Sequence, residues 1–129
     1  MHRRYIAIGA VLAAIAVALG AFGAHGLKKI VPAETVQTFQ TGVQYQMYHS
    51  LALILAGVLY ERFHHKFVKI AGMLFLFGII LFSGSLYLLT FFNATETVGM
   101  EKFGLITPFG GIAFIAGWLF LFISAVKSK

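Results

Sequence analysis

Five polar residues lie in or beside apolar stretches of the chain, where side chains able to do chemistry are uncommon: His25, Gln44, His49, Ser83 and Ser85. Histidine can gain or lose a proton near neutral pH, and an ionisable residue inside a membrane often marks a path for protons or ions. These residues form the candidate polar intramembrane cluster. The chemistry that they could support is the binding or relay of a proton or cation along a hydrated path.

A structural role for the same side chains is the favoured interpretation. In this interpretation a neutral His49 is satisfied by a Gln or Ser side chain, with Thr107 as a further partner, and the network fixes the register of neighbouring helices. Hydrogen bonds of this kind between membrane helices average about 0.6 kcal/mol. Both roles require the polar side chains to point into the protein, because an unpaired polar group in hydrocarbon costs free energy.

Residue sets for other chemistry are missing from the sequence. The chain has no cysteine, and it contains no Ser-His-acid set, HExxH pair or phosphate-cradling loop. His25 and His49 have no third ligand at metal-binding spacing. We therefore expect a protein that is not an enzyme and that uses no metal and no cofactor.

Four long apolar stretches must position these side chains. They cover residues 5–24, 41–60, 70–92 and 105–126. Each approaches or exceeds the roughly 20 residues that span a bilayer core as a helix. With 60% hydrophobic and 11% charged residues, the chain has too little polar surface for a soluble globule. The sequence predicts an all-α integral membrane protein, in which residues 1–129 form one domain of four transmembrane helices in a compact bundle.

Basic residues predict the orientation of this bundle. Seven of them fall on one side of a four-span arrangement: Arg3, Arg4, Arg62, Lys66, Lys69, Lys127 and Lys129. Only Lys28, Lys29 and Lys102 fall on the other. The positive-inside rule then places both termini in the cytoplasm. Although the net charge is +6, the basic blocks lie beside apolar spans, so we expect anionic lipid headgroups and no nucleic acid as their partners.

Small residues repeat along one face of the first and the last span. They are Gly9, Ala13, Ala16 and Gly20 in the first, and Gly110, Ala113 and Gly117 in the last. Small residues let membrane helices approach closely. The pattern predicts that these two spans can bring their backbones near each other, and it favours a retained first helix over a cleaved signal peptide.

The second span is the most polar of the four. Its helical pattern extends back toward Pro32, and at 100° per residue one face carries the polar side chains. That face consists of Glu34, Gln37, Thr38, Thr41, Gln44, Tyr45, Tyr48 and His49. We expect it to point into the bundle and not at lipid.

Several separate motifs carry a resemblance over nearly the whole chain. They are Gly20-Ala21-Phe22-Gly23-Ala24-His25-Gly26-Leu27, Tyr45-Gln46-Met47-Tyr48-His49-Ser50-Leu51-Ala52-Leu53, Ser83-Gly84-Ser85-Leu86-Tyr87, Thr107-Pro108-Phe109-Gly110-Gly111 and Gly117-Trp118. The chain resembles the bacterial membrane family of domain of unknown function 423, to which eukaryotic transmembrane protein 256 is similar. The resemblance implies a small four-helix protein of the bacterial cytoplasmic membrane. It implies no reaction and supplies no functional residues.

The sequence leaves three function classes open, of which a membrane enzyme is the least favoured because it would need a cofactor or partner to supply the missing groups. The favoured one is a structural or accessory component of the cytoplasmic membrane, acting as a homo-oligomer or with a membrane protein partner. The alternative is a small oligomeric channel or carrier for protons, ions or a small solute that uses the polar face of the second helix. Four helices enclose little space beyond their own side chains, so a pore would require several subunits.

Overall fold

The computed structural model describes residues 1–128, and every regular element in that range is helical. The all-α prediction is therefore confirmed. The elements in chain order are α1 (Arg3–Ala24), the 3-10 turn η1 (Leu27–Lys29), α2 (Ala33–Leu59), α3 (His65–Gly78), the π-helical turn η2 (Ile79–Ser83), α4 (Gly84–Ala94), the 3-10 turn η3 (Glu101–Leu105) and α5 (Thr107–Lys127).

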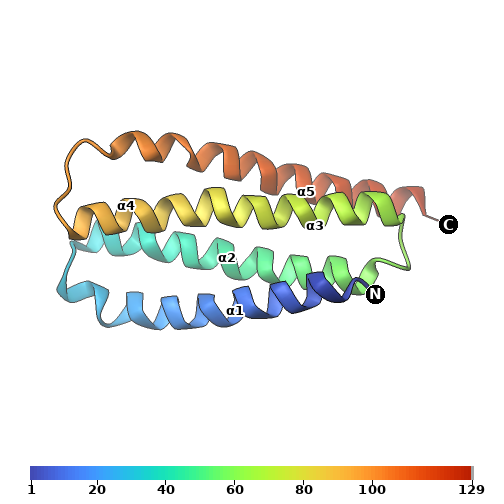
Figure 1. The fold of residues 1–129 in the computed structure, drawn as a ribbon, viewed down its shortest axis with the longest axis horizontal. Helices are drawn as coiled ribbons and strands as arrows, with labels where there is room; N and C mark the ends of the chain where they lie inside the picture. The colour runs from blue at the N-terminus through green and yellow to red at the C-terminus, as the bar shows by residue number, and fades with distance from the viewer. Residues whose placement is uncertain (129) are drawn as a thin grey trace.

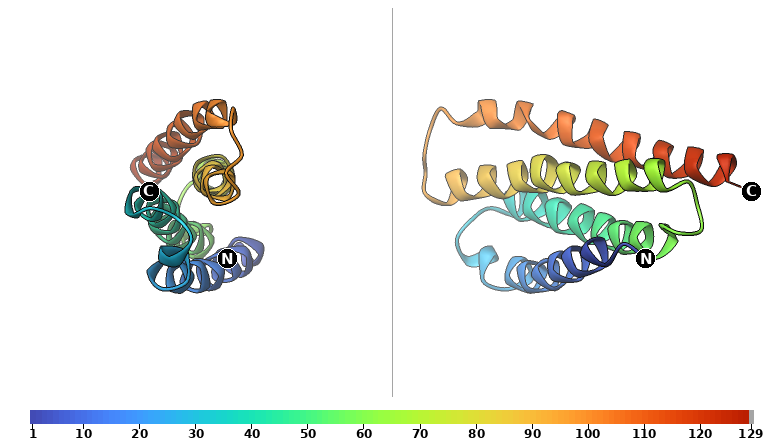
Figure 2. Two further views of the ribbon diagram at one scale, coloured as in Figure 1. Left: turned by 90° about the vertical axis from the view of Figure 1, so that its left-hand side faces the viewer. Right: turned by 45° about the vertical axis from the view of Figure 1, so that its right-hand side comes forward.

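Four long helical rods make up the molecule, because α3, η2 and α4 continue one another without a break (Figure 1). The two termini and the turn between α2 and α3 lie at one end of the long axis. Seen along that axis, α1 and α5 lie on opposite sides of the central pair formed by α2 and the α3–α4 rod (Figure 2). The arrangement thus places α2 beside α1 and the α3–α4 rod beside α5.

Three segments are long and apolar enough to cross a membrane by length and composition: Arg3–Lys29, His65–Ala94 and Glu101–Lys127. They contain the predicted spans 5–24, 70–92 and 105–126. The predicted span 41–60 falls almost entirely inside α2, but α2 is not among the three. Its first half is too polar, since it carries Glu34 and four glutamines.

The small residues of α1 and α5 pack against different partners. A Cβ atom on Gly9 would lie 2.8 Å from the Ser50 carbonyl oxygen of α2, and Ala16 is buried on the same side of α1. On α5, a Cβ on Gly117 would lie 2.7 Å from the Phe75 ring of α3. The predicted approach of the first and last spans to each other is therefore wrong: α1 meets α2, and α5 meets the α3–η2 segment.

The remaining small residues of the two faces are less tightly enclosed. Gly20 faces Val43 of α2, with a distance of 3.3 Å from an added Cβ to Val43 Cγ1. Ala13 and Ala113 are half-buried. The tightest approach between backbones on the α5 side is at Gly110, which lies against the main chain of Phe82 in the π-helical turn.

The contact at Gly110 generates a matched pair of substitutions. An alanine Cβ at Gly110 would lie 2.7 Å from Phe82 Cα, so Gly110→Ala must displace backbone, and we expect a loss of about 1 to 3 kcal/mol of unfolding free energy. Gly111 has open space around its Cα, so Gly111→Ala should be neutral or stabilising by up to about 1 kcal/mol. Thermal unfolding of both variants in detergent measures the difference. Equal unfolding temperatures would contradict this packing of α5 on η2.

Candidate functional site

His49 lies in a buried position between α2, the α3–η2 segment and α5, with 5% of its surface exposed. The indole Nε1 of Trp118 donates a hydrogen bond to His49 Nε2 at 3.1 Å. An indole N–H can only donate, so Nε2 must accept and the ring hydrogen must sit on Nδ1. His49 Nδ1 is 2.8 Å from the Tyr45 carbonyl oxygen, which accepts that hydrogen. In this arrangement the imidazole is neutral and both of its nitrogens are used.

Aromatic side chains enclose the His49 ring. Phe114 of α5 stacks on it with ring centroids 3.5 Å apart and an interplanar angle of 11°. Phe75 lies 5.7 Å away on another side. Trp118 and Tyr45 are 43% and 38% exposed, and each has its ring within about 6 Å of the imidazole. A proton or metal ion could reach Nε2 only after the Trp118 hydrogen bond breaks, and none of these neighbours is a second metal ligand.

A second buried polar contact ties three helices together at Gln46, which is 3% exposed. Its Nε2 donates to the Leu12 carbonyl oxygen of α1 at 2.7 Å. Its Oε1 accepts from the Tyr87 hydroxyl of α4 at 2.6 Å. The side chain therefore joins α1, α2 and α4, and it leaves no oxygen or nitrogen of the amide without a partner.

The serines predicted for the polar cluster are buried, but they bond to other groups than His49. Ser83 Oγ donates to the Gly42 carbonyl oxygen of α2 at 2.6 Å. Ser85 Oγ lies 2.5 Å from the Thr107 hydroxyl, which joins α4 to α5, and 2.8 Å from the Phe82 carbonyl oxygen. The predicted cluster thus separates into single contacts spread along α2 and α4.

The two other predicted members lie outside these contacts. Gln44 is exposed on α2, and His25 is exposed at the end of α1, with Nδ1 3.0 Å from the Ala21 carbonyl oxygen. The expectation that the polar face of α2 points into the bundle is wrong for Glu34, Gln37, Gln44 and Tyr48, which are exposed, and it is confirmed for the buried His49. The residues of α2 that face the interior centre on Gly42, Gln46 and Ser50. On this face Gly42 and Ser50 let α2 approach its neighbours, and the Gln46 amide between them is paired by Leu12 and Tyr87.

The predicted polar cluster omits three residues that form these hydrogen bonds: Gln46, Tyr87 and Trp118. Trp118 did carry a signal, because it is the single tryptophan of the chain and an indole N–H in an apolar helix needs an acceptor. Gln46 and Tyr87 are polar residues within the predicted spans 41–60 and 70–92, but nothing in the sequence shows that they pair with each other. Their pairing depends on which face of α2 meets α4, which helical periodicity alone leaves open.

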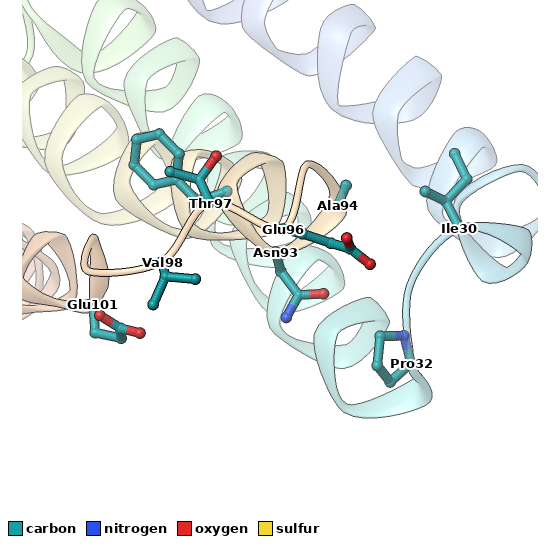
Figure 3. Close-up of a pocket in the computed structure, with 9 residues that line it drawn as sticks. Ile30, Pro32, Asn93, Ala94, Glu96, Thr97, Val98 and Glu101 are labelled. Carbon is teal, nitrogen blue, oxygen red and sulfur yellow. The ribbon is translucent and has the colours of Figure 1, made fainter.

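A groove of about 430 Å³ lies at the opposite end of the molecule from the termini, between the α1–α2 connection and the segment after α4. Glu96 and Glu101 line it, and Figure 3 shows Glu96 extending toward Ile30 and Pro32 while Glu101 lies beyond Val98. No group of three His, Asp or Glu side chains in residues 1–128 is placed to hold a metal ion. The groove therefore provides no set of metal ligands from these residues.

Comparison with known proteins gives one consistent result. Residues 19–111 match the family described as protein of unknown function DUF423. The chain is 45% identical to the UPF0382 membrane protein YwdK of Bacillus subtilis, over 95% of this chain and 96% of that one. It is 35% identical to the UPF0382 inner membrane protein YgdD of Escherichia coli, over 100% of this chain and 95% of the relative. No solved structure matches.

The contact between Gln46 and Tyr87 can be measured by a double-mutant cycle. We expect Gln46→Leu to lower the unfolding free energy by about 1 to 3 kcal/mol, because it leaves the half-buried Tyr87 hydroxyl and the Leu12 carbonyl oxygen without their partner. Tyr87→Phe should cost less, and the coupling between the two sites should be about 0.6 to 1.7 kcal/mol. Denaturant titration of the four proteins in mixed micelles gives these values. Strictly additive losses would show that the two side chains do not interact.

Proposed function

The chain belongs to the DUF423 family of membrane proteins, and from this premise we propose that it is a structural or accessory component of a bacterial cytoplasmic membrane and not an enzyme. In this proposal it has four transmembrane helices, with both termini in the cytoplasm. The inner-membrane location is carried over from the name of the Escherichia coli relative.

The satisfaction of the buried polar groups is the observation that carries this function. Within residues 1–128, every buried side-chain nitrogen or oxygen has a hydrogen-bond partner. His49 uses both ring nitrogens inside an aromatic enclosure, and Gln46 uses both ends of its amide. A transport path needs polar groups that exchange partners with water or solute. These groups instead hold helices in register, which suits a protein whose role is assembly.

Connectivity supports α2 as the fourth span. The beginnings of α1 and of the His65–Ala94 segment lie at the same end of the molecule (Figure 1). If both segments cross the bilayer from the same side, the chain between them has to cross the bilayer in the opposite direction. The 27-residue α2 is about 40 Å long, which exceeds the roughly 30 Å of a bilayer core. Its hydrogen bonds to α1 and α4 reduce the cost of its polar residues.

The distribution of basic residues supports the orientation. Arg3, Arg4, Arg62, Lys66 and Lys69 gather at the end that holds the termini and the α2–α3 turn. Lys28, Lys29 and Lys102 lie at the other end. Under the positive-inside rule the first end faces the cytoplasm, where anionic headgroups are the natural partners of the basic residues.

A stripe of side chains on α2, exposed except for the half-buried Thr41, supports self-association as part of this role. We define the α2 stripe as Gln37, Thr41, Gln44, Tyr48, Leu51, Leu55 and Val58, which follow one another at alternating spacings of four and three. This spacing is that of a helix pairing with another helix along a left-handed seam. Glutamine and threonine both donate and accept, so two copies of the stripe could satisfy each other. A second copy of the chain is the occupant that we propose.

The same stripe is the observation that favours the alternative function. Several copies arranged with the α2 stripes inward would surround a polar path, which makes the protein a small oligomeric channel or carrier. The path would then run between subunits and not past His49. The α2 stripe is therefore the part of the chain that distinguishes the two functions.

Single cysteines test the four-span orientation, since the natural chain has none. We expect Ile30→Cys to react with a membrane-impermeant maleimide in intact spheroplasts. His64→Cys and Ser128→Cys should react only after the membrane is permeabilised, because the proposal places them in the cytoplasm. Labelling of Ile30→Cys and His64→Cys from the same side would remove α2 as a span.

A flux assay in liposomes separates the two functions. The accessory role predicts that the purified protein moves protons and potassium ions no faster than empty vesicles do. It also predicts that His49→Ala loses on the order of 3 kcal/mol of stability, as truncation of a buried aromatic ring does, without changing flux. A flux in the wild type that Gln44→Leu abolishes, with folding intact, would establish the channel instead.

The oligomeric state is read from the same vesicles. Oxidation should link Tyr48→Cys, on the α2 stripe, into a covalent dimer. Val17→Cys is the matched control, because it is 63% exposed on α1 and lies outside the stripe. Equal crosslinking of the two variants would remove the α2 stripe as the interface.

A further inference from the structure

A groove of about 570 Å³ opens between the first turns of α1 and α3, at the end that holds the termini. Three basic side chains line it from two helices: Arg3 and Arg4 on α1, and Lys69 on α3. All three are exposed. The groove therefore concentrates positive charge at one point of the molecule where a membrane helix begins on each side.

The wall of the groove changes from basic to apolar along the helices. Ile8 and Met73 also line it, and they are 37% and 45% exposed. Each lies four residues further along its helix than Arg4 or Lys69, a rise of about 6 Å toward the bilayer interior. A molecule that fills the groove would thus meet cations at its outer end and apolar side chains at its inner end.

Tyr5 holds the two helices at a fixed separation beside this groove. Its hydroxyl donates to the Lys69 carbonyl oxygen at 2.5 Å, and its ring stacks on His2 with centroids 3.8 Å apart. Gly72 of α3 gives the Tyr5 ring its space, since a Cβ there would collide with it. The groove is consequently formed before any ligand binds.

The one acidic residue close to this end does not oppose an anion. Glu61 forms an ion pair of 2.8 Å with the N-terminal ammonium group. That ammonium group holds the pKa of the Glu61 carboxyl below its usual range, and the two ionised groups together carry no net charge. Arg3, Arg4 and Lys69 keep their positive charges for a ligand.

We propose that this groove is a binding site for an anionic phospholipid, with its phosphate between Arg3, Arg4 and Lys69 and its acyl chains along Ile8 and Met73. Arginine and lysine bind phosphate oxygens through charge-assisted hydrogen bonds, and basic pockets between membrane helices are suited to phospholipid headgroups. This inference rests on the proposed function, which places this end of the molecule at the cytoplasmic face of the membrane. It adds a binding site and a class of ligand to that function.

Thermal unfolding of the full chain in a nonionic detergent tests the site. Phosphatidylglycerol should raise the unfolding temperature in a saturable way, whereas phosphatidylcholine should not. Replacement of Arg3, Arg4 and Lys69 together by Gln should weaken the apparent affinity about 100-fold, because each basic residue contributes roughly a factor of five at an anionic surface. The matched control replaces Lys28, Lys29 and Lys102 by Gln, which makes the same change of charge at the other end and should leave the affinity unchanged.

Two further measurements complete the test. Lys69→Gln alone changes one exposed side chain, so it keeps the test valid if the triple variant does not fold, and it should weaken binding about fivefold. Inorganic phosphate is added in a separate arm. Stabilisation by inorganic phosphate alone would identify a site for free anions and would overturn the proposal that the ligand is a lipid. An equal loss of phosphatidylglycerol affinity in both triple variants would overturn the proposal that the groove is the binding site. Cysteine labelling decides the orientation independently, so failure of one proposal is distinguishable from failure of the other.

Discussion

The structure depends on the requirement that a polar group inside hydrocarbon finds a partner within the protein. α2 carries more polar side chains than any other helix, and Gln46 and His49, which face the interior, are paired by the other helices. Gln46 reaches α1 and α4, the Gly42 carbonyl receives Ser83, and His49 receives the Trp118 indole of α5. Each neighbour of α2 is thus fixed by at least one hydrogen bond in addition to apolar packing.

Small residues make these hydrogen bonds geometrically accessible. Gly9 brings α1 close to the Ser50 backbone, and Gly110 brings α5 close to the π-helical turn. Without those approaches the Gln46 amide could not reach Leu12, and His49 could not lie flat on Phe114. Packing and polar pairing therefore stabilise the same arrangement, which is why a network worth little per bond can still specify one register.

Much of the fold could be predicted from sequence, because apolar length and basic flanks follow directly from bilayer thickness and charge. The burial of His49, Ser83 and Ser85 also agrees with expectation, whereas the predicted contacts of Ser85 and Thr107 with His49 are replaced by a hydrogen bond between Ser85 and Thr107. The inward face of α2 could not be predicted. Helical periodicity places Gln44 and His49 on one face of α2. The contacts of α2 with its neighbouring helices depend instead on the positions of glycine and serine, which a pattern of polar residues does not reveal. Gln44 was misplaced for that reason, whereas His25 lies exposed at the end of α1, beside the carbonyl oxygen of Ala21.

Exposed polar side chains are distributed unequally among the helices, and this distribution constrains the function of the protein. Beyond their first turns, α1 and α5 present apolar or small side chains outward, and Ser83, Ser85 and Thr90 of the α3–α4 rod are buried. All four glutamines of the chain lie on α2, and two of them, Gln37 and Gln44, are exposed. If α2 spans the membrane as proposed, lipid cannot satisfy the polar side chains of the α2 stripe, so a bilayer favours states in which another protein surface or water covers it. Both assembly and transport would have to use this stripe, and it is the place where the function of the protein should be sought.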